Sequence, residues 1–147
     1  FIGSDVILGL NSTNSILTSK NEIKYFSNYK KFYVLIVKPN FGCSTKAIYA
    51  RVRKFNKSML NQPNKKMFNF DFLKKTHNQL ESIAFLKHPK LKKIKSYLEN
   101  LFKPDLVRMT GSGSALVAYY RSKQRCEIAK KKFRKKYKGT ISHISKK

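Results

Sequence analysis

Residues 108–120 read Arg-Met-Thr-Gly-Ser-Gly-Ser-Ala-Leu-Val-Ala-Tyr-Tyr, and they indicate two strands joined by a glycine-rich turn. The two glycines permit positive φ values and a close approach of the backbone to a ligand. The hydroxyl side chains between them, together with successive backbone N–H groups, are typical of a nest that binds an anion. The alternative is a plain hairpin connection, because glycine and serine are also common in turns.

The rest of the chain alternates between strand-like and helix-like segments. Residues 32–38 predict a buried strand, with shorter strands near 15–18, 22–26 and 140–144. Residues 56–70 are polar and are interpreted as a loop. Apolar spacing and N-capping residues predict four helices, over residues 44–52, 71–85 (capped by Asp71), 89–101 and 122–137. This order predicts an α+β fold, an antiparallel sheet with helices packed on one face.

Composition narrows the class of protein further. A chain of 147 residues with 41% apolar residues can form one ordinary globular domain. Its apolar runs fall short of the roughly 18 residues that cross a bilayer, so we expect a cytoplasmic protein with no membrane partner. Cys43 and Cys126 stand far apart, and we expect reduced thiols, buried or half-buried, with neither a disulfide nor a metal site.

The formal net charge is +26, which by itself favours an anionic partner. However, 27 of the 33 basic residues are lysines, whereas arginine is preferred for paired contacts to phosphate and guanine. Basic residues are spread along the chain, and only residues 128–138 form a dense block. The excess of Lys, Asn, Ile, Phe and Tyr is typical of an AT-rich genome. We therefore do not expect sequence-driven nucleic-acid binding, although small polyanions are well served by this charge.

Four stretches resemble the motifs of the GHMP small-molecule kinases, in the order expected of that family. They are Ile-Gly-Ser-Asp-Val at 2–6, Lys-Pro-Asn-Phe-Gly-Cys-Ser-Thr-Lys-Ala-Ile-Tyr at 38–49, Asn-Gln-Leu-Glu at 78–81 and the glycine-rich stretch at 108–118. Gln79 replaces the family's usual acid, and Ile7, Leu8 and Gly9 replace its usual Pro and Phe. The resemblance covers nearly the whole chain.

The resemblance implies a domain organisation. Residues 1–30 would be the tail of the N-terminal kinase domain, and residues 31–147 the GHMP kinase C-terminal domain. The family's first motif and its glycine-rich ATP loop precede the stretch at 2–6. Because the chain begins at Phe1 and enters that stretch directly, we expect a piece of a longer protein, with the N-terminal half as its missing partner.

The resemblance also implies site residues. Asp5 would be the catalytic base toward the substrate hydroxyl, although an Asp after Gly-Ser is also a common helix N-cap. Tyr49 would stack on a cytosine ring, its alternative being a core tyrosine, and Thr45 would lie near the ribose or diphosphate. The residues that would enclose phosphates are those of the glycine-rich turn: Thr110, Gly111, Ser112, Gly113 and Ser114.

The cofactors implied are ATP and Mg²⁺, the metal being held by nucleotide phosphates and water, since the sequence offers no cluster of carboxylates. The nearest members of the family phosphorylate the 2-hydroxyl of a cytidine-diphosphate-linked methylerythritol, in isoprenoid precursor biosynthesis. Two alternatives stay open: a GHMP kinase acting on mevalonate, homoserine or a sugar, and a basic module that binds RNA or ribosomes. The isolated chain is expected to be inactive without the ATP loop.

Overall fold

The computed structural model describes residues 14–18, 20, 22–26, 32–57, 62–64, 67, 69–138 and 141–146. The chain divides into two compact units. The first unit is built from residues 1–30 and 56–76, and the second from residues 31–55 and 77–147. Residues 56–76 thus group with residues 1–30 in the first unit. The assignment of 1–30 and 31–147 to two kinase domains stays a prediction.

The second unit is built on a four-stranded antiparallel sheet in the order β4-β5-β3-β6. Its strands are β3 (Tyr33–Lys38), β4 (Leu106–Met109), β5 (Leu116–Tyr120) and β6 (Ile141–Lys146). The glycine-rich turn joins β4 to β5, as the sequence predicted. The order places β4 at one edge of the sheet, which matters for the loop that follows it.

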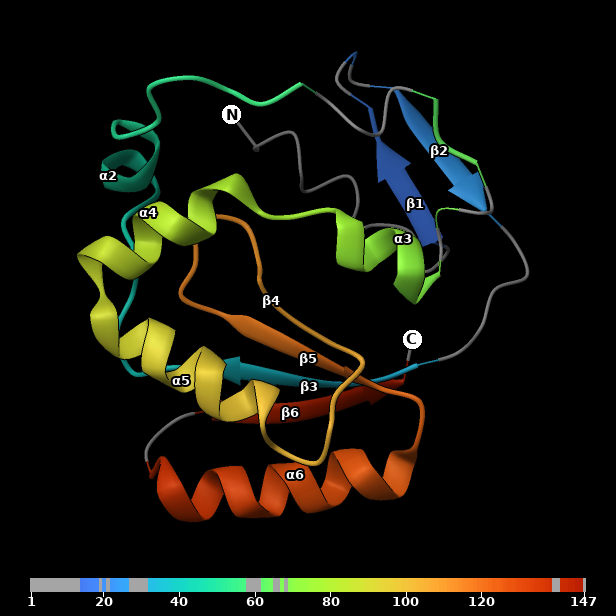
Figure 1. Ribbon diagram of the computed structural model, residues 1–147, viewed down its shortest axis with the longest axis vertical. Coiled ribbons are helices and arrows are strands. Elements are labelled where there is room, and N and C mark those ends of the chain that lie inside the picture. Colours follow the sequence, from blue (N-terminus) through green and yellow to red (C-terminus); the bar gives the residue numbers. More distant parts are fainter. Residues whose placement is uncertain are drawn as a thin grey trace. The chain divides into compact units, whose positions relative to one another are not determined.

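Helices pack on one face of this sheet, as Figure 1 shows for α5 (Pro89–Glu99) and α6 (Lys123–Lys136). Side chains of a strand alternate between the two faces, and cross-strand partners share a face. Leu35 is paired with Ala118, which is paired with Val107, and all three belong to the hydrophobic core. The same core contains buried residues of both helices: Leu91, Ile94, Leu98, Cys126, Ala129 and Phe133. The predicted α+β architecture is confirmed.

The first unit contains a two-stranded antiparallel sheet, β1 (Asn14–Leu17) and β2 (Ile23–Phe26), and the short helix α3 (Phe70–Lys75). The turn between the strands closes on Thr18. Its N–H donates to the Glu22 carbonyl at 2.9 Å, and its hydroxyl accepts from the N–H groups of Lys20 and Glu22. These two strands match the two short strands that the sequence predicted.

The single helix predicted over residues 71–85 is wrong, because the structure has two helices there, α3 and α4 (Gln79–Lys87). Asn69, not Asp71, caps α3 by accepting from the Phe72 N–H at 2.8 Å. Thr76 then takes an extended conformation, with φ −84° and ψ 159°, which ends the helix. Asn78 caps α4 through the Leu80 N–H at 3.0 Å. Apolar residues keep a helical spacing across this break, so the sequence pattern alone predicts one continuous helix.

The other helix ends follow their sequence signals. Ser44 caps α2 (Thr45–Tyr49), which is shorter than predicted, and Ser122 caps α6. Pro89 occupies the first turn of α5, where its missing N–H costs nothing. Among the helices of the described ranges, none combines the length and the apolarity needed to span a bilayer.

Candidate functional site

The glycine-rich loop between β4 and β5 is a tight turn that leaves its tip open. The Thr110 N–H donates to the Ala115 carbonyl at 2.9 Å, and the Gly113 N–H donates to the Thr110 carbonyl at 3.0 Å. Gly111 has φ +49°, and a Cβ added there would meet nothing within 4 Å. Within the described part of the chain, no hydrogen bond is made by the N–H groups of Gly111 and Ser112. Two donors that no described group engages, at an open tip, suit an anionic ligand.

Gly113 is required for close packing. It has φ +94°, and a Cβ there would lie 2.9 Å from Met109 Sδ and 3.1 Å from Cys43 Sγ. The first distance is shorter than side-chain atoms tolerate, and the conformation is one that residues with a Cβ rarely adopt. The second glycine of the loop is therefore fixed by sterics, whereas the first gives an open surface.

Ser114 faces the interior and holds the base of the loop. Its side chain is fully buried, and its hydroxyl donates to the Phe41 carbonyl at 2.5 Å. Lys38, at the end of β3, donates to the Ser114 hydroxyl at 3.0 Å and to the Phe41 carbonyl at 3.2 Å. Among the described residues, no carboxylate forms an ion pair with Lys38. Its positive charge is thus offset by no carboxylate of the described ranges, and it lies at the base of the loop beside Ser114.

Helix α2 brings its first turn to the same loop. Thr45 Oγ1 lies 2.9 Å from Ser112 Oγ, a hydrogen bond between residues that are 67 positions apart. Tyr49 ends α2 and keeps 47% of its surface exposed. It is therefore not a core tyrosine, and its ring is available for stacking. The structure thus brings Thr45 and the loop together, with Tyr49 one turn further along the helix.

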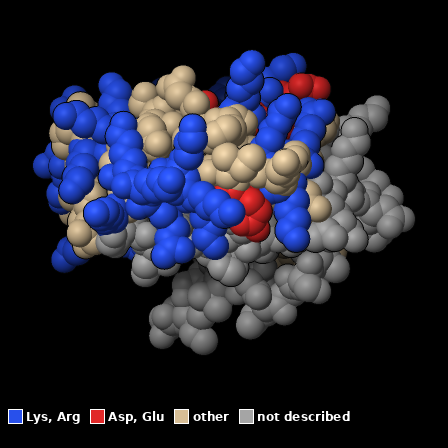
Figure 2. All heavy atoms as spheres, turned by 90° about the horizontal axis from the view of Figure 1, so that it is seen from below, with Lys and Arg blue, Asp and Glu red and all other residues tan. Residues whose placement is uncertain are grey.

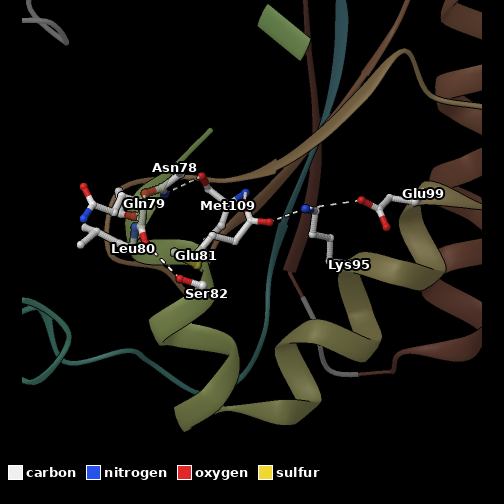
Figure 3. Close-up of polar contacts among 9 residues, drawn as sticks. Asn78, Gln79, Leu80, Glu81, Ser82, Lys95, Glu99 and Met109 are labelled. Carbon is white, nitrogen blue, oxygen red and sulfur yellow. Dashed lines mark hydrogen bonds and ion pairs between the residues drawn. The ribbon is translucent and has the colours of Figure 1, made fainter. Parts of the chain in front are cut away.

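The N-terminus of α4 holds the other side of the loop (Figure 3). Asn78 Nδ2 donates to the Met109 carbonyl at 3.0 Å and to the Gly111 carbonyl at 2.7 Å. Glu81 Oε2 accepts from the Met109 N–H at 3.1 Å. Lys95 of α5 forms an ion pair with the other Glu81 oxygen and a second with Glu99 at 3.4 Å.

Two lysines lie near Cys43, whose side chain packs close to Gly113 of the loop. Burial raises the pKa of the Cys43 thiol, and the nearby ammonium groups of Lys38 and Lys87 offset part of that rise. A wider basic surface lies on α6, whose exposed side chains include Lys131, Lys132, Arg134, Lys135 and Lys136. Figure 2 views the molecule from the side on which α6 lies, and Lys and Arg atoms cover much of that face.

Asp5, the predicted catalytic base, lies outside the described residues. Cys43 is half-buried and Cys126 buried, and both are free thiols, as the sequence predicted. In the described ranges, no three His, Cys, Asp or Glu side chains come together as a metal site would require.

Sequence reasoning assigned no role to three of the residues that organise the loop: Lys38, Asn78 and Glu81. All three residues stand within stretches that resemble family motifs. Their roles, however, depend on contacts with residues far away in the sequence. A lysine directly after a buried strand, and an Asn-x-x-Glu pattern at a helix start, were the signals available in the sequence.

Comparisons with known proteins identify the family of this chain. Residues 52–139 match the model of the GHMP kinases C-terminal family. A 4-diphosphocytidyl-2-C-methyl-D-erythritol kinase from Pelagibacter ubique is 49% identical over 136 residues, covering 92% of this chain and 48% of the relative. The kinase of the same name from Buchnera aphidicola is 32% identical over 84% of this chain and 39% of the relative. The chain thus spans about half the length of the curated relatives it matches or less.

Solved structures show the same fold. A crystal structure of 4-(cytidine 5'-diphospho)-2C-methyl-D-erythritol kinase superposes with a TM-score of 0.73 at 19% identity, over 97% of this chain and 53% of that one. A homoserine kinase from Cytophaga hutchinsonii gives 0.69 at 12% identity, over 89% of this chain and 47% of that one. With the family model matching more than half of its residues, this chain belongs to the GHMP kinases, and it contains their C-terminal domain.

Proposed function

We propose that this chain is the C-terminal part of a small-molecule kinase. The complete protein would transfer the γ-phosphoryl group of ATP to the 2-hydroxyl of 4-diphosphocytidyl-2-C-methyl-D-erythritol, in the cytoplasm. The choice of substrate is supported by the 49% identity to the Pelagibacter kinase of that name. The half of such a kinase that this chain does not span would supply the ATP loop, because the matched relatives are about twice as long or more.

The observation on which the proposal rests is the open tip of the glycine-rich loop. Gly111 and Ser112 each offer an N–H group that has no partner among the described residues, and Lys38 contacts Ser114 at the base of the same loop. Backbone donors and a fixed positive charge stabilise the charge that develops on a transferring phosphoryl group. We assign Thr110, Gly111, Ser112 and Gly113 to the phosphate enclosure, and Ser114 to holding the loop in place.

The described basic residues and loop N–H groups suit the phosphates of ATP, whereas the described carboxylates would supply few ligands to Mg²⁺. Among the residues that the structure describes, no three His, Cys, Asp or Glu side chains come together as a metal site would require. Three of the described carboxylates also form ion pairs: Glu81 and Glu99 with Lys95, and Asp105 with Arg121 at 3.0 Å. Mg²⁺ would therefore be held by nucleotide phosphates and water, which is its usual preference. Bound there, it would neutralise charge between the phosphates. The role of this chain would be to position the acceptor hydroxyl and the phosphates.

Three residues would act on the alcohol substrate. Tyr49, exposed at the end of α2, would stack on the cytosine, and Thr45 would contact the ribose or diphosphate beside the loop. Asp5 would accept the proton of the attacking hydroxyl. Asp5→Asn in the full-length kinase should retain substrate binding and lose most turnover, and near-normal turnover would contradict the assignment.

The test of the proposed function is a substrate panel with the full-length kinase. The cytidyl methylerythritol compound, mevalonate, homoserine and a galactose substrate would each be supplied with ATP and Mg²⁺. Phosphorylation of the cytidyl compound alone is the expected result. Phosphorylation of mevalonate or homoserine instead would overturn the substrate choice while keeping the family.

A further inference from the structure

We propose that Asn78 is a positioning residue that aims the Ser112 N–H toward the phosphates, and that Glu81 and Lys95 support it. The proposal rests on the proposed function, in which the glycine-rich loop encloses phosphate. It assigns the start of α4 a role in catalysis although Asn78 and Glu81 touch no reacting atom.

The first step of the argument concerns the edge of the sheet. β4 is an edge strand, so the outward-facing N–H and C=O groups of its residues have no strand to pair with. For Met109, the last residue of β4, side chains take the place of that strand. Asn78 donates to its carbonyl at 3.0 Å, and Glu81 accepts from its N–H at 3.1 Å. The strand end from which the loop departs is therefore fixed on both sides.

The second step concerns the direction of a peptide plane. Asn78 also donates to the Gly111 carbonyl at 2.7 Å, so this carbonyl points toward α4. The peptide bond between Gly111 and Ser112 is trans, since among the described residues the cis bond is that between Gly113 and Ser114. In a trans peptide the N–H points opposite to the C=O. The contact of Asn78 with the Gly111 carbonyl therefore turns the Ser112 N–H away from α4.

The third step concerns why an asparagine is needed. Its Nδ2 has two hydrogens, which serve the two loop carbonyls, while Oδ1 accepts from the Leu80 N–H as the N-cap of α4. A serine or an aspartate can also cap a helix, but neither can donate two hydrogens to carbonyls. The capping role and the positioning role of Asn78 can thus be separated by substitution.

Glu81 and Lys95 fix the remaining freedom. Both side chains are largely shielded, with 14% and 20% of their surface exposed. Lys95 engages one oxygen of Glu81, which leaves the other aimed at the Met109 N–H (Figure 3). Glu81→Gln keeps an acceptor for that N–H and loses the charge that attracts Lys95, whereas Glu81→Ala loses both.

The experiment compares Asn78→Ser and Asn78→Asp with wild type in the full-length kinase. Both substitutions keep an N-cap for α4, so the protein should fold. We expect kcat to fall about 10- to 100-fold, because small misplacements of catalytic groups cost that much, with KM for the alcohol changed less than threefold. Asn100→Asp is the matched control, since Asn100 donates to the Ser96 carbonyl at the end of α5. It should leave kcat unchanged.

Two further measurements separate positioning from stability. Glu81→Gln should recover most of the kcat that Glu81→Ala loses. In an NMR titration with ADP, the Ser112 amide should shift in the wild-type kinase and shift much less in Asn78→Ser. An Asn78→Ser variant that unfolds at a lower temperature but keeps wild-type kcat and the Ser112 shift would overturn the inference. Failure of the wild-type kinase to phosphorylate the cytidyl compound would instead contradict the proposed function.

Discussion

The Thr45 and Ser112 hydroxyls lie 2.9 Å apart and join the start of α2 to the tip of the glycine-rich loop. Each hydroxyl can donate one hydrogen and accept others, so this contact leaves lone pairs on both groups for a ligand. Helix α2 ends at Tyr49, and so the candidate stacking residue is tied through a five-residue helix to the candidate phosphate loop. Substitutions in either segment should therefore affect recognition of the same substrate.

Gly113→Ala should destabilise the protein and disturb the loop. The new Cβ would meet Met109 Sδ at 2.9 Å, and its backbone would be held at φ +94°. We expect the free energy of unfolding to fall by about 1–3 kcal/mol, as is typical of overpacking. Chemical denaturation measures it. Gly42→Ala is the control, because a Cβ there meets nothing within 4 Å, and it should stay within about 0.5 kcal/mol of wild type.

Tyr49→Ala in the full-length kinase should raise KM for the cytidyl substrate and leave KM for ATP unchanged. Stacking of a base on an aromatic ring contributes about 1–3 kcal/mol, which corresponds to roughly 5- to 150-fold in KM. Steady-state kinetics with each substrate varied in turn checks it. Phe55→Ala removes another exposed aromatic, and should change neither constant. Equal effects of the two substitutions would remove Tyr49 from the site.

Gln79→Glu should lower the stability of the protein by removing a hydrogen bond to the segment that contains Lys54. The Gln79 side-chain amide donates a hydrogen bond to the Lys54 carbonyl, and a carboxylate cannot donate there. We expect a loss of about 0.5–1.5 kcal/mol in the free energy of unfolding, the usual net worth of one hydrogen bond. Thermal unfolding followed by circular dichroism is the measurement. Gln124→Glu, on the exposed surface of α6, serves as the control, and a loss as large as that at residue 79 would refute the explanation.

Cys126 should make the protein lose stability at alkaline pH. Burial, and secondarily the charge of Glu127, raise the pKa of its thiol from 9.0 to about 11, while Lys130 opposes the shift. Because the pKa of the Cys126 thiol is higher in the folded protein than in the unfolded chain, the contribution of the protonated thiol to folding stability is complete below pH 9. It is lost as the pH rises from 9 to 11, where the unfolded chain releases its proton first.

The measurement is the free energy of unfolding at a series of pH values between 8 and 11, for wild type and for Cys126→Ala. Tyr119 and Tyr120 also make the protein less stable toward the upper end of this range, since burial raises the pKa of both phenols. The variant should therefore show a shallower decline than wild type, not a flat line. Parallel declines would show that the thiol does not contribute.

Local chemistry in the sequence was enough to predict most of the elements. A continuous run of apolar and β-branched residues that ends before Pro39 defined β3, and the glycine-rich turn between two apolar runs defined the hairpin of β4 and β5. Serine caps and Pro89 marked three helix starts. These signals act within a few residues, which is why they can be found in one dimension. The order of the four motifs along the chain, which indicated the family, can also be read from the sequence alone.

Contacts between distant residues were decided only by the tertiary structure. The break between α3 and α4 follows Thr76 and Asn78, and Asn78 is held there by carbonyls some thirty residues further along the chain. Ser114 looked like a phosphate ligand in a serine-rich turn, but folding buries it against Lys38 and Phe41. The physical reason is that a side chain's hydrogen-bond partner depends on which groups the fold brings near it, and spacing along the chain does not contain that information.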